Sequence, residues 1–420
     1  MTSVGPSIPR GVSPLEGVAR MTSRVTRELT LDAAIGKAAM FLLRDLSALS
    51  AASQLPIGPV FREVVRISKN ASSIEAVIKI LELTPREELR AVQALWEEAK
   101  TGLAVESRFL PIRDKNDQPF DGVVARLVRF RPPVETSVLM GLFVVPGIIE
   151  SPAKFIDRWE RLARRGFDVF VLEMPGIHTN LHNPIPLEKR FMSSYVASHT
   201  LAAAADEARL WMDAEPTTRG LLMGGLLASH STFMGMESAV VLGHTLPFGA
   251  GLAMEGPRIH AGRKYDAFKY RLTKLLAWLN PKAPFLFGRF NFPVSRPKPK
   301  PFLPEGDPRL DWQKKLHEAG LTLRSYNGPL VFSVWRAQKV LAKALLAPDG
   351  HRNLPKRLRI GIHPNDEEVS NAHTERLMAQ IDADPSRPNV ERVEQAAHSM
   401  GYFPETDGAL ADWFLEARTG

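Results

Sequence analysis

The sequence predicts an α/β fold with a mostly parallel, doubly wound sheet, and two features carry this prediction. Residues 138–145 form a continuous apolar run, which is typical of a strand buried on both faces of a sheet. A helical pattern over residues 153–165 and a second apolar strand from Asp168 follow at short spacing. Because such crossovers are right-handed and compact, the two strands are expected to lie parallel and side by side.

The composition sets limits on the kind of protein. The chain has 420 residues, 44% of them hydrophobic and 24% charged, so it can bury a large core. It contains no cysteine, which excludes disulfides, thiolate metal sites and a cysteine nucleophile. We expect no cofactor and no metal site. No apolar run reaches the roughly 18 residues of a membrane span, so we expect a cytoplasmic protein.

Two segments precede the predicted sheet. Residues 1–28 mix Ser, Pro, Gly and Arg without apolar periodicity, and we expect a disordered leader. Residues 29–104 predict a helical extension, in which Thr84-Pro85-Arg86-Glu87 has the N-cap, first-turn proline and following glutamate typical of a helix start. We expect this extension to pack or dimerise rather than to catalyse.

Residues 105–249 are predicted to form the first part of the core. Alternation of strands and helices places the loops that build a site at the carboxyl ends of the strands. The expected strands are 105–112, 122–130, 138–145, 168–176, 219–224 and 238–243, and the later helices are 194–213 and 226–236. The last part of the core, residues 351–420, adds strands 358–362 and 390–393 and helices 371–381 and 405–418.

Residues 250–350 interrupt this alternation and are predicted to be a cap or lid insertion. The net charge of +8 is concentrated there, because residues 263–301 hold ten Lys and Arg against one acidic residue, Asp266. Phenylalanines lie among these cations, which favours contact with anionic lipid, a membrane surface or an acyl substrate with an acidic head. A solvated charged face is the alternative. Nucleic acid is disfavoured because no nucleic-acid-binding fold is recognisable.

Three segments stand at the ends of predicted strands: Val145-Pro146-Gly147, Ile362-His-Pro-Asn-Asp366, and Ala397-His398-Ser-Met-Gly-Tyr-Phe-Pro-Glu405. They resemble the α/β-hydrolase superfamily, and in outline the chain is similar to monoacylglycerol lipases and lysophospholipase-type serine hydrolases. The resemblance covers about residues 105–418. It implies an oxyanion loop at Gly147 and Ile148, a triad acid at Asp366 and a general base at His398. Glu367 and Glu368 are rivals for the acid.

The nucleophile is the weak point of the resemblance. In this superfamily G-x-S-x-G places a serine on a strained turn between a strand and a helix. The segment that best fits this turn is Gly224-Gly225-Leu226-Leu227-Ala228, so we expect a degenerate elbow centred on Leu226, with the N–H of Leu227 as an oxyanion donor. Ser229 and Ser231 would then lie in the following helix, where attack needs an unusual geometry.

A second placement of the elbow uses Gly243-His244-Thr245-Leu246-Pro247, with Thr245 as the nucleophile. This placement is less favoured because proline replaces the flanking glycine. Even in the first placement, His244 and Thr245 are expected to end the neighbouring strand and to face the same crevice.

The resemblance implies a hydrolase that acts on an ester, a lactone or another hydrophobic acyl substrate through His398 and Asp366. Because leucine cannot attack a carbonyl, ordinary serine-ester hydrolysis is expected to be absent or weak, and His398 would instead activate water or abstract a proton. The alternative is a non-catalytic pseudo-hydrolase that binds a ligand, a membrane surface or a protein partner.

Overall fold

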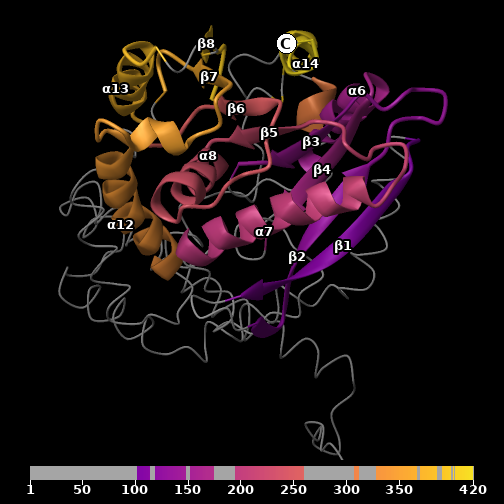
Figure 1. Ribbon diagram of the computed structural model, residues 1–420, viewed down its shortest axis with the longest axis horizontal. Coiled ribbons are helices and arrows are strands. Elements are labelled where there is room, and N and C mark those ends of the chain that lie inside the picture. The colour runs from indigo at the N-terminus through magenta and orange to yellow at the C-terminus, as the bar shows by residue number, and fades with distance from the viewer. Residues whose placement is uncertain are drawn as a thin grey trace, which may run out of the picture.

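The protein is built on one eight-stranded sheet with the strand order β1-β2-β4-β3-β5-β6-β7-β8 (Figure 1). The computed structural model describes residues 102–113, 119–147, 152–174, 194–259, 307–311, 328–366, 369–385, 390–398, 401 and 403–419. The strands are β1 (Val105–Arg113), β2 (Pro119–Phe130), β3 (Met140–Val145), β4 (Phe167–Glu173), β5 (Met223–Ala228), β6 (Gly251–Glu255), β7 (Leu358–Ile362) and β8 (Val390–Glu394). β2 pairs antiparallel with β1 and β4, and the strands from β4 to β8 are parallel.

Helices cover both faces of this sheet. The described helices are η1 (Pro152–Phe155), α6 (Ile156–Arg164), α7 (Ser194–Asp213), α8 (His230–Met236), η3 (Glu237–Val241), α12 (Gly328–Leu345), η4 (Gly350–Asn353), α13 (Asn371–Asp382) and α14 (Glu405–Glu416). α6 and α14 share one apolar cluster, whereas α7, α8, α12 and α13 share the other. In Figure 1 the second group lies in front of the sheet.

The central strand β3 shows why its sequence is apolar throughout. Leu142 and Val144 belong to the cluster on the α6 and α14 face, and Phe143 and Val145 belong to the cluster on the α7 and α8 face. Side chains alternate between the two faces of a strand, so a strand covered on both faces must be apolar at every position. The predicted parallel sheet and the predicted crossover from β3 through α6 to β4 are confirmed.

The structure corrects the predicted course of the chain between residues 219 and 255. The predicted strand 219–224 is wrong by several residues, because β5 covers Met223–Ala228 and α8 begins only at His230. Gly224 and Gly225 lie within this strand, where Cβ atoms would approach the rings of Phe414 and Phe248 to 2.4 Å and 2.6 Å. The two glycines therefore make room for aromatic packing on the two faces and do not end the strand.

The predicted strand 238–243 is also wrong. The chain continues from α8 into η3, a π-helical turn, and Glu237 in it accepts a 2.6 Å hydrogen bond from Ser198 of α7. Tertiary packing outweighs the preference of its valines for strands. The strand that does follow is β6 (Gly251–Glu255), which lies beyond the predicted core boundary at residue 249. The predicted leader and most of the helical extension (residues 29–104) and of the insertion lie outside the described residues.

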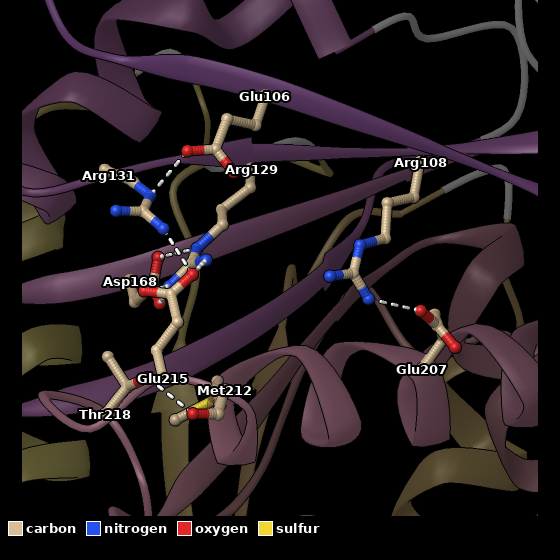
Figure 2. A network of polar contacts seen from close by, with 9 residues as sticks. All are labelled: Glu106, Arg108, Arg129, Arg131, Asp168, Glu207, Met212, Glu215 and Thr218. Carbon is tan, nitrogen blue, oxygen red and sulfur yellow. Dashed lines mark hydrogen bonds and ion pairs between the residues drawn. The ribbon is translucent and has the colours of Figure 1, made fainter.

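A buried network of charges joins β1, β2, β4 and the end of α7 (Figure 2). Arg129 of β2 is 1% exposed, and its Nε donates to the carboxylate of Asp168 at 2.8 Å and 3.1 Å. Its other nitrogens donate to Glu215, which also accepts from Arg131. Burial acts to raise the pKa of Glu215, but Arg129 and Arg131 outweigh burial and leave that pKa lowered. Asp168 lies near the amino end of β4, so this network joins these elements at the end of the sheet opposite the carboxyl ends of the parallel strands.

Removal of this cation should be strongly destabilising. In Arg129→Met, Asp168 stays buried without its partner, so we expect the free energy of unfolding to fall by about 3–5 kcal/mol, measured by urea denaturation. Arg392→Met is the control: its contact with Glu375 is 3.7 Å long and both side chains are more than half exposed. We expect a change below about 1 kcal/mol for the control. Equal effects in the two variants would contradict the prediction.

Glu237 should make the free energy of unfolding fall as the pH rises. Burial raises the pKa of this carboxyl, and the hydrogen bond from Ser198 offsets burial only in part. The folded protein therefore holds this proton more tightly than the unfolded chain, and the stabilisation is lost as the pH rises through the folded-state pKa. In Glu237→Gln the free energy of unfolding should decline less between mildly acidic and neutral pH than in the native protein. Glu375→Gln, at an exposed position, should leave the native pH dependence in place.

Candidate active site

Ser229 occupies a sharp turn between the end of β5 at Ala228 and the start of α8 at His230. Its backbone has φ 50° and ψ −113°, and among the described residues it is the only non-glycine residue with a positive φ. Side chains larger than hydrogen disfavour this conformation, and strained turns of this kind present a side chain away from strand and helix. The N–H of Ser229 donates to the carbonyl of Glu255 at 2.7 Å, which joins the turn to the end of β6.

A continuous chain of hydrogen bonds runs from this serine to a buried carboxylate. Nε2 of His398 lies 2.6 Å from Oγ of Ser229, and Nδ1 lies 2.5 Å from Oδ2 of Asp366. Asp366 follows β7 and its side chain is 1% exposed, whereas that of His398, which follows β8, is 22% exposed. With the proton on Nδ1 shared with Asp366, Nε2 accepts from the serine hydroxyl. This is the arrangement of a nucleophile, a general base and an orienting acid.

The backbone around β6 and β8 holds the histidine in place. Gly256 has φ +55°, and a Cβ there would lie 3.0 Å from Nδ1 of His398. Its N–H donates to the side-chain oxygen of Gln395 at 3.1 Å, and the N–H of Gln395 donates to the carbonyl of Ile362 at 2.8 Å. The glycine is required both by its φ and by the closeness of the ring.

The loop after β3 lies beside the same turn. The hydroxyl of Ser231, in the first turn of α8, donates to the carbonyl of Pro146, and the buried Gly147 follows directly. His230, the residue after Ser229, is the first residue of α8. The bond from Ser231 to Pro146 therefore holds the start of the loop after β3 against the first turn of α8, next to Ser229. Ile148 lies outside the described residues.

The predicted elbow at Leu226 is wrong, because Leu226 and Leu227 both lie within β5 and belong to the two apolar clusters. The residue after the turn is His230, so Leu227 does not supply the N–H next to the nucleophile position. Ser229, expected inside the helix, lies in the turn itself. Gly235 of α8 explains why the glycine signature is missing, because a Cβ there would lie 2.2 Å from Cδ1 of Leu227. The small residue needed for close packing is on the helix, and the strand carries leucine.

The expected positions of His244 and Thr245 are also wrong. Neither residue ends a strand, since both follow η3, and Thr245 is exposed. His244 instead pairs with His199 of α7, with 2.7 Å between its Nε2 and the Nδ1 of His199. The hydroxyl within hydrogen-bond distance of His398 is that of Ser229. Glu367 and Glu368, the rival acids, lie outside the described residues.

The described residues lack two further features, a cluster of metal ligands and a membrane-spanning helix. No group of three His, Asp or Glu side chains in this part of the chain is arranged to hold a metal ion. None of its helices combines the length and the apolar character needed to cross a bilayer.

Solved structures with this fold include several lipases and esterases. A soluble variant of monoglyceride lipase from Saccharomyces cerevisiae, solved with a substrate analogue, matches 75% of this chain and 95% of its own, with a TM-score of 0.56 and 14% identity. Monoacylglycerol lipase from Paleococcus ferrophilus matches 69% and 98% of the two chains, with a TM-score of 0.48 and 16% identity. No family model and no curated protein matches the sequence. The chain has the α/β-hydrolase fold, as predicted.

The strain at Ser229 can be measured with two variants that both lack the hydroxyl. A positive φ costs a residue with a side chain about 1–3 kcal/mol, and glycine gives back about 0.5–1 kcal/mol through its freer unfolded state. We therefore expect Ser229→Gly to be more stable than Ser229→Ala by about 1 kcal/mol in urea denaturation. Because both variants lose the bond to His398, their difference reports on the backbone. Equal stability would mean that the turn is not strained.

Proposed function

We propose that the protein is a serine hydrolase that cleaves esters of hydrophobic acyl groups. Ser229 is the nucleophile, His398 the general base and Asp366 the orienting acid. The observation that carries the proposal is the hydrogen-bond chain from Oγ of Ser229 through the His398 ring to Asp366, with distances of 2.6 Å and 2.5 Å. It replaces the serine-free reaction expected from the sequence, because a hydroxyl lies where that reaction assumed none.

The proposed reaction has two halves. Oγ of Ser229 attacks the ester carbonyl while Nε2 of His398 takes the hydroxyl proton, and the imidazolium is stabilised by Asp366. When the tetrahedral intermediate collapses, the bond to the leaving alkoxide breaks and His398 returns the proton to that oxygen. A water then attacks the acyl-serine while His398 takes its proton; when this second intermediate collapses, the bond from the acyl carbon to Oγ breaks and His398 returns the proton to Oγ, which releases the carboxylic acid and restores Ser229.

Two backbone N–H groups are proposed to stabilise the oxyanion. One is the N–H of His230, which directly follows the nucleophile, and the other belongs to the loop after β3, at Gly147 or Ile148. The hydrogen bond from Ser231 to Pro146 supports this proposal because it fixes the start of that loop against α8. Donors held in place before the reaction need no reorganisation as charge develops.

One solved structure with the same fold supports the proposed substrate class. The Saccharomyces cerevisiae protein is a monoglyceride lipase, which directs the first assays to esters of glycerol with acyl groups. The predicted amphipathic segment 263–301 lies outside the described residues, so contact with anionic lipid and a cytoplasmic location with peripheral membrane binding stay predictions from the sequence.

The proposal is tested with a fluorophosphonate probe and a p-nitrophenyl ester. Ser229→Ala should abolish covalent labelling and lower kcat by about 10³-fold or more, because no other group supplies the attacking oxygen. Thr245→Ala is the matched control: it removes an exposed hydroxyl that the sequence also offered as the nucleophile, and it should leave both readouts unchanged.

Two outcomes would contradict this assignment. Labelling that survives in Ser229→Ala but disappears in Thr245→Ala would move the nucleophile to Thr245. A native protein that neither reacts with the probe nor hydrolyses esters of any chain length, yet binds a long-chain fatty acid, would favour the pseudo-hydrolase.

A further inference from the structure

We infer that Arg158 is a positioning residue that fixes the turn at Ser229 relative to the loop that carries His398. This inference rests on the proposed function, since it concerns the same site. Arg158 lies on α6 and is 3% exposed. Its Nη1 and Nη2 donate to the two carboxylate oxygens of Glu255 at 3.0 Å and 2.5 Å, and its Nε donates to Asp407 at 2.8 Å.

Glu255 connects this arginine to the nucleophile. It is the last residue of β6, and its backbone carbonyl accepts the 2.7 Å hydrogen bond from the N–H of Ser229. The next residue, Gly256, is the one whose backbone lies against the His398 ring. Glu255, whose carboxylate binds Arg158, therefore also contacts Ser229 through its backbone and precedes the residue that packs against His398.

Asp407 connects the same arginine to the part of the chain that follows His398. It lies in the first turn of α14, the helix that follows His398 in the chain, and it is 1% exposed. Arg161 of α6 donates to its other oxygen at 2.9 Å and 2.7 Å. Nearby, a Cβ at Gly401 would lie 2.6 Å from the ring of Phe155, so Gly401, between His398 and α14 in the chain, packs against the residue that precedes α6.

The charges in this cluster balance, and their geometry requires arginine. Two cations, Arg158 and the 36% exposed Arg161, face two carboxylates, so the cluster carries no net charge. Burial acts to lower the pKa of Arg158, but Glu255 and Asp407 outweigh burial and raise it, so the guanidinium stays charged. A guanidinium has nitrogens in a fixed planar fork that can bind two carboxylates at once, whereas a lysine presents a single ammonium. Lysine at this position keeps the charge and loses the link between β6 and α14.

Such a link affects the rate more than the binding of substrate. A displacement of about 1 Å between reacting groups can cost about 10²-fold in rate. Arg158 is 3% exposed, so its replacement shifts the reacting groups without removing an exposed side chain that could contact the substrate, and kcat should fall while KM changes little. A purely structural role would instead lower stability and leave the folded enzyme fully active.

The test compares Arg158→Lys with Arg129→Lys. Arg129, whose network Figure 2 shows, is also buried and also bridges two carboxylates. Its partner Asp168 lies near the amino end of β4, whereas Glu255 lies at the carboxyl end of β6. Three readouts are taken on each folded protein: kcat and KM for the ester, the rate of fluorophosphonate labelling, and the NMR resonances of the His398 ring, assigned by their loss in His398→Ala.

We expect Arg158→Lys to lower kcat and the labelling rate by about 10- to 100-fold, with KM within about twofold, and to shift the His398 resonances. Arg129→Lys should lower the urea midpoint and leave all three readouts native. If Arg158→Lys does not fold, Glu255→Gln keeps the arginine and the side-chain shape and should change the same readouts in the same direction.

Native kinetics and native His398 resonances in a folded Arg158→Lys or Glu255→Gln protein would overturn the inference. Changes of equal size in Arg129→Lys would overturn it as well, because they would report general loosening of the fold. The NMR readout needs no turnover: if the native protein hydrolyses no ester, the proposed function fails, while the His398 resonances of the variants still decide the role of Arg158.

Discussion

The turn at Ser229 depends on one backbone hydrogen bond, and the rest of the site is arranged around it. β5 and β6 pair in parallel with Ala228 opposite Glu255, so the N–H of the next residue, Ser229, meets the carbonyl of Glu255. This bond compensates part of the cost of a positive φ, which Ser229 alone among the described non-glycine residues adopts. Because β7 and β8 continue the same parallel register, the loops with Asp366 and His398 reach the same edge of the sheet.

Much of the fold was predictable because its signals are local. The apolar run of β3, the strands flanking α6 and the elements after residue 351 follow from periodicity within short windows. Asp366 and His398 were identified through the resemblance of their segments to a known family. Each follows a predictable strand, and parallel strands bring the loops after them to the same end of the sheet, where the two side chains lie 2.5 Å apart.

The nucleophile was not predictable in this way, because its signal depends on a contact between two elements. The usual motif places glycine on the strand so that the helix can approach. Here Leu227 occupies that position and Gly235, the sixth residue of α8, leaves the space for its side chain. Gly224 and Gly225, the glycines that resemble the motif, instead leave space for aromatic rings from α14 and from the loop before β6. A pattern of residues along one strand cannot show which partner carries the small residue.

Two buried arginines at opposite edges of the sheet show how charge is used in this fold. A buried ion pair contributes little net stability relative to well-packed apolar side chains, because desolvation offsets the attraction. The pair instead fixes the relative positions of the elements that carry it, because a guanidinium binds its carboxylates in only a few geometries. At Arg129 this geometry holds the hairpin of β1 and β2 against β4 and α7. At the Arg158 edge the same chemistry fixes β6 to α14, and those two elements adjoin Ser229 and His398. Positional accuracy matters most at that edge, because a reaction there depends on distances of 2.5–2.6 Å.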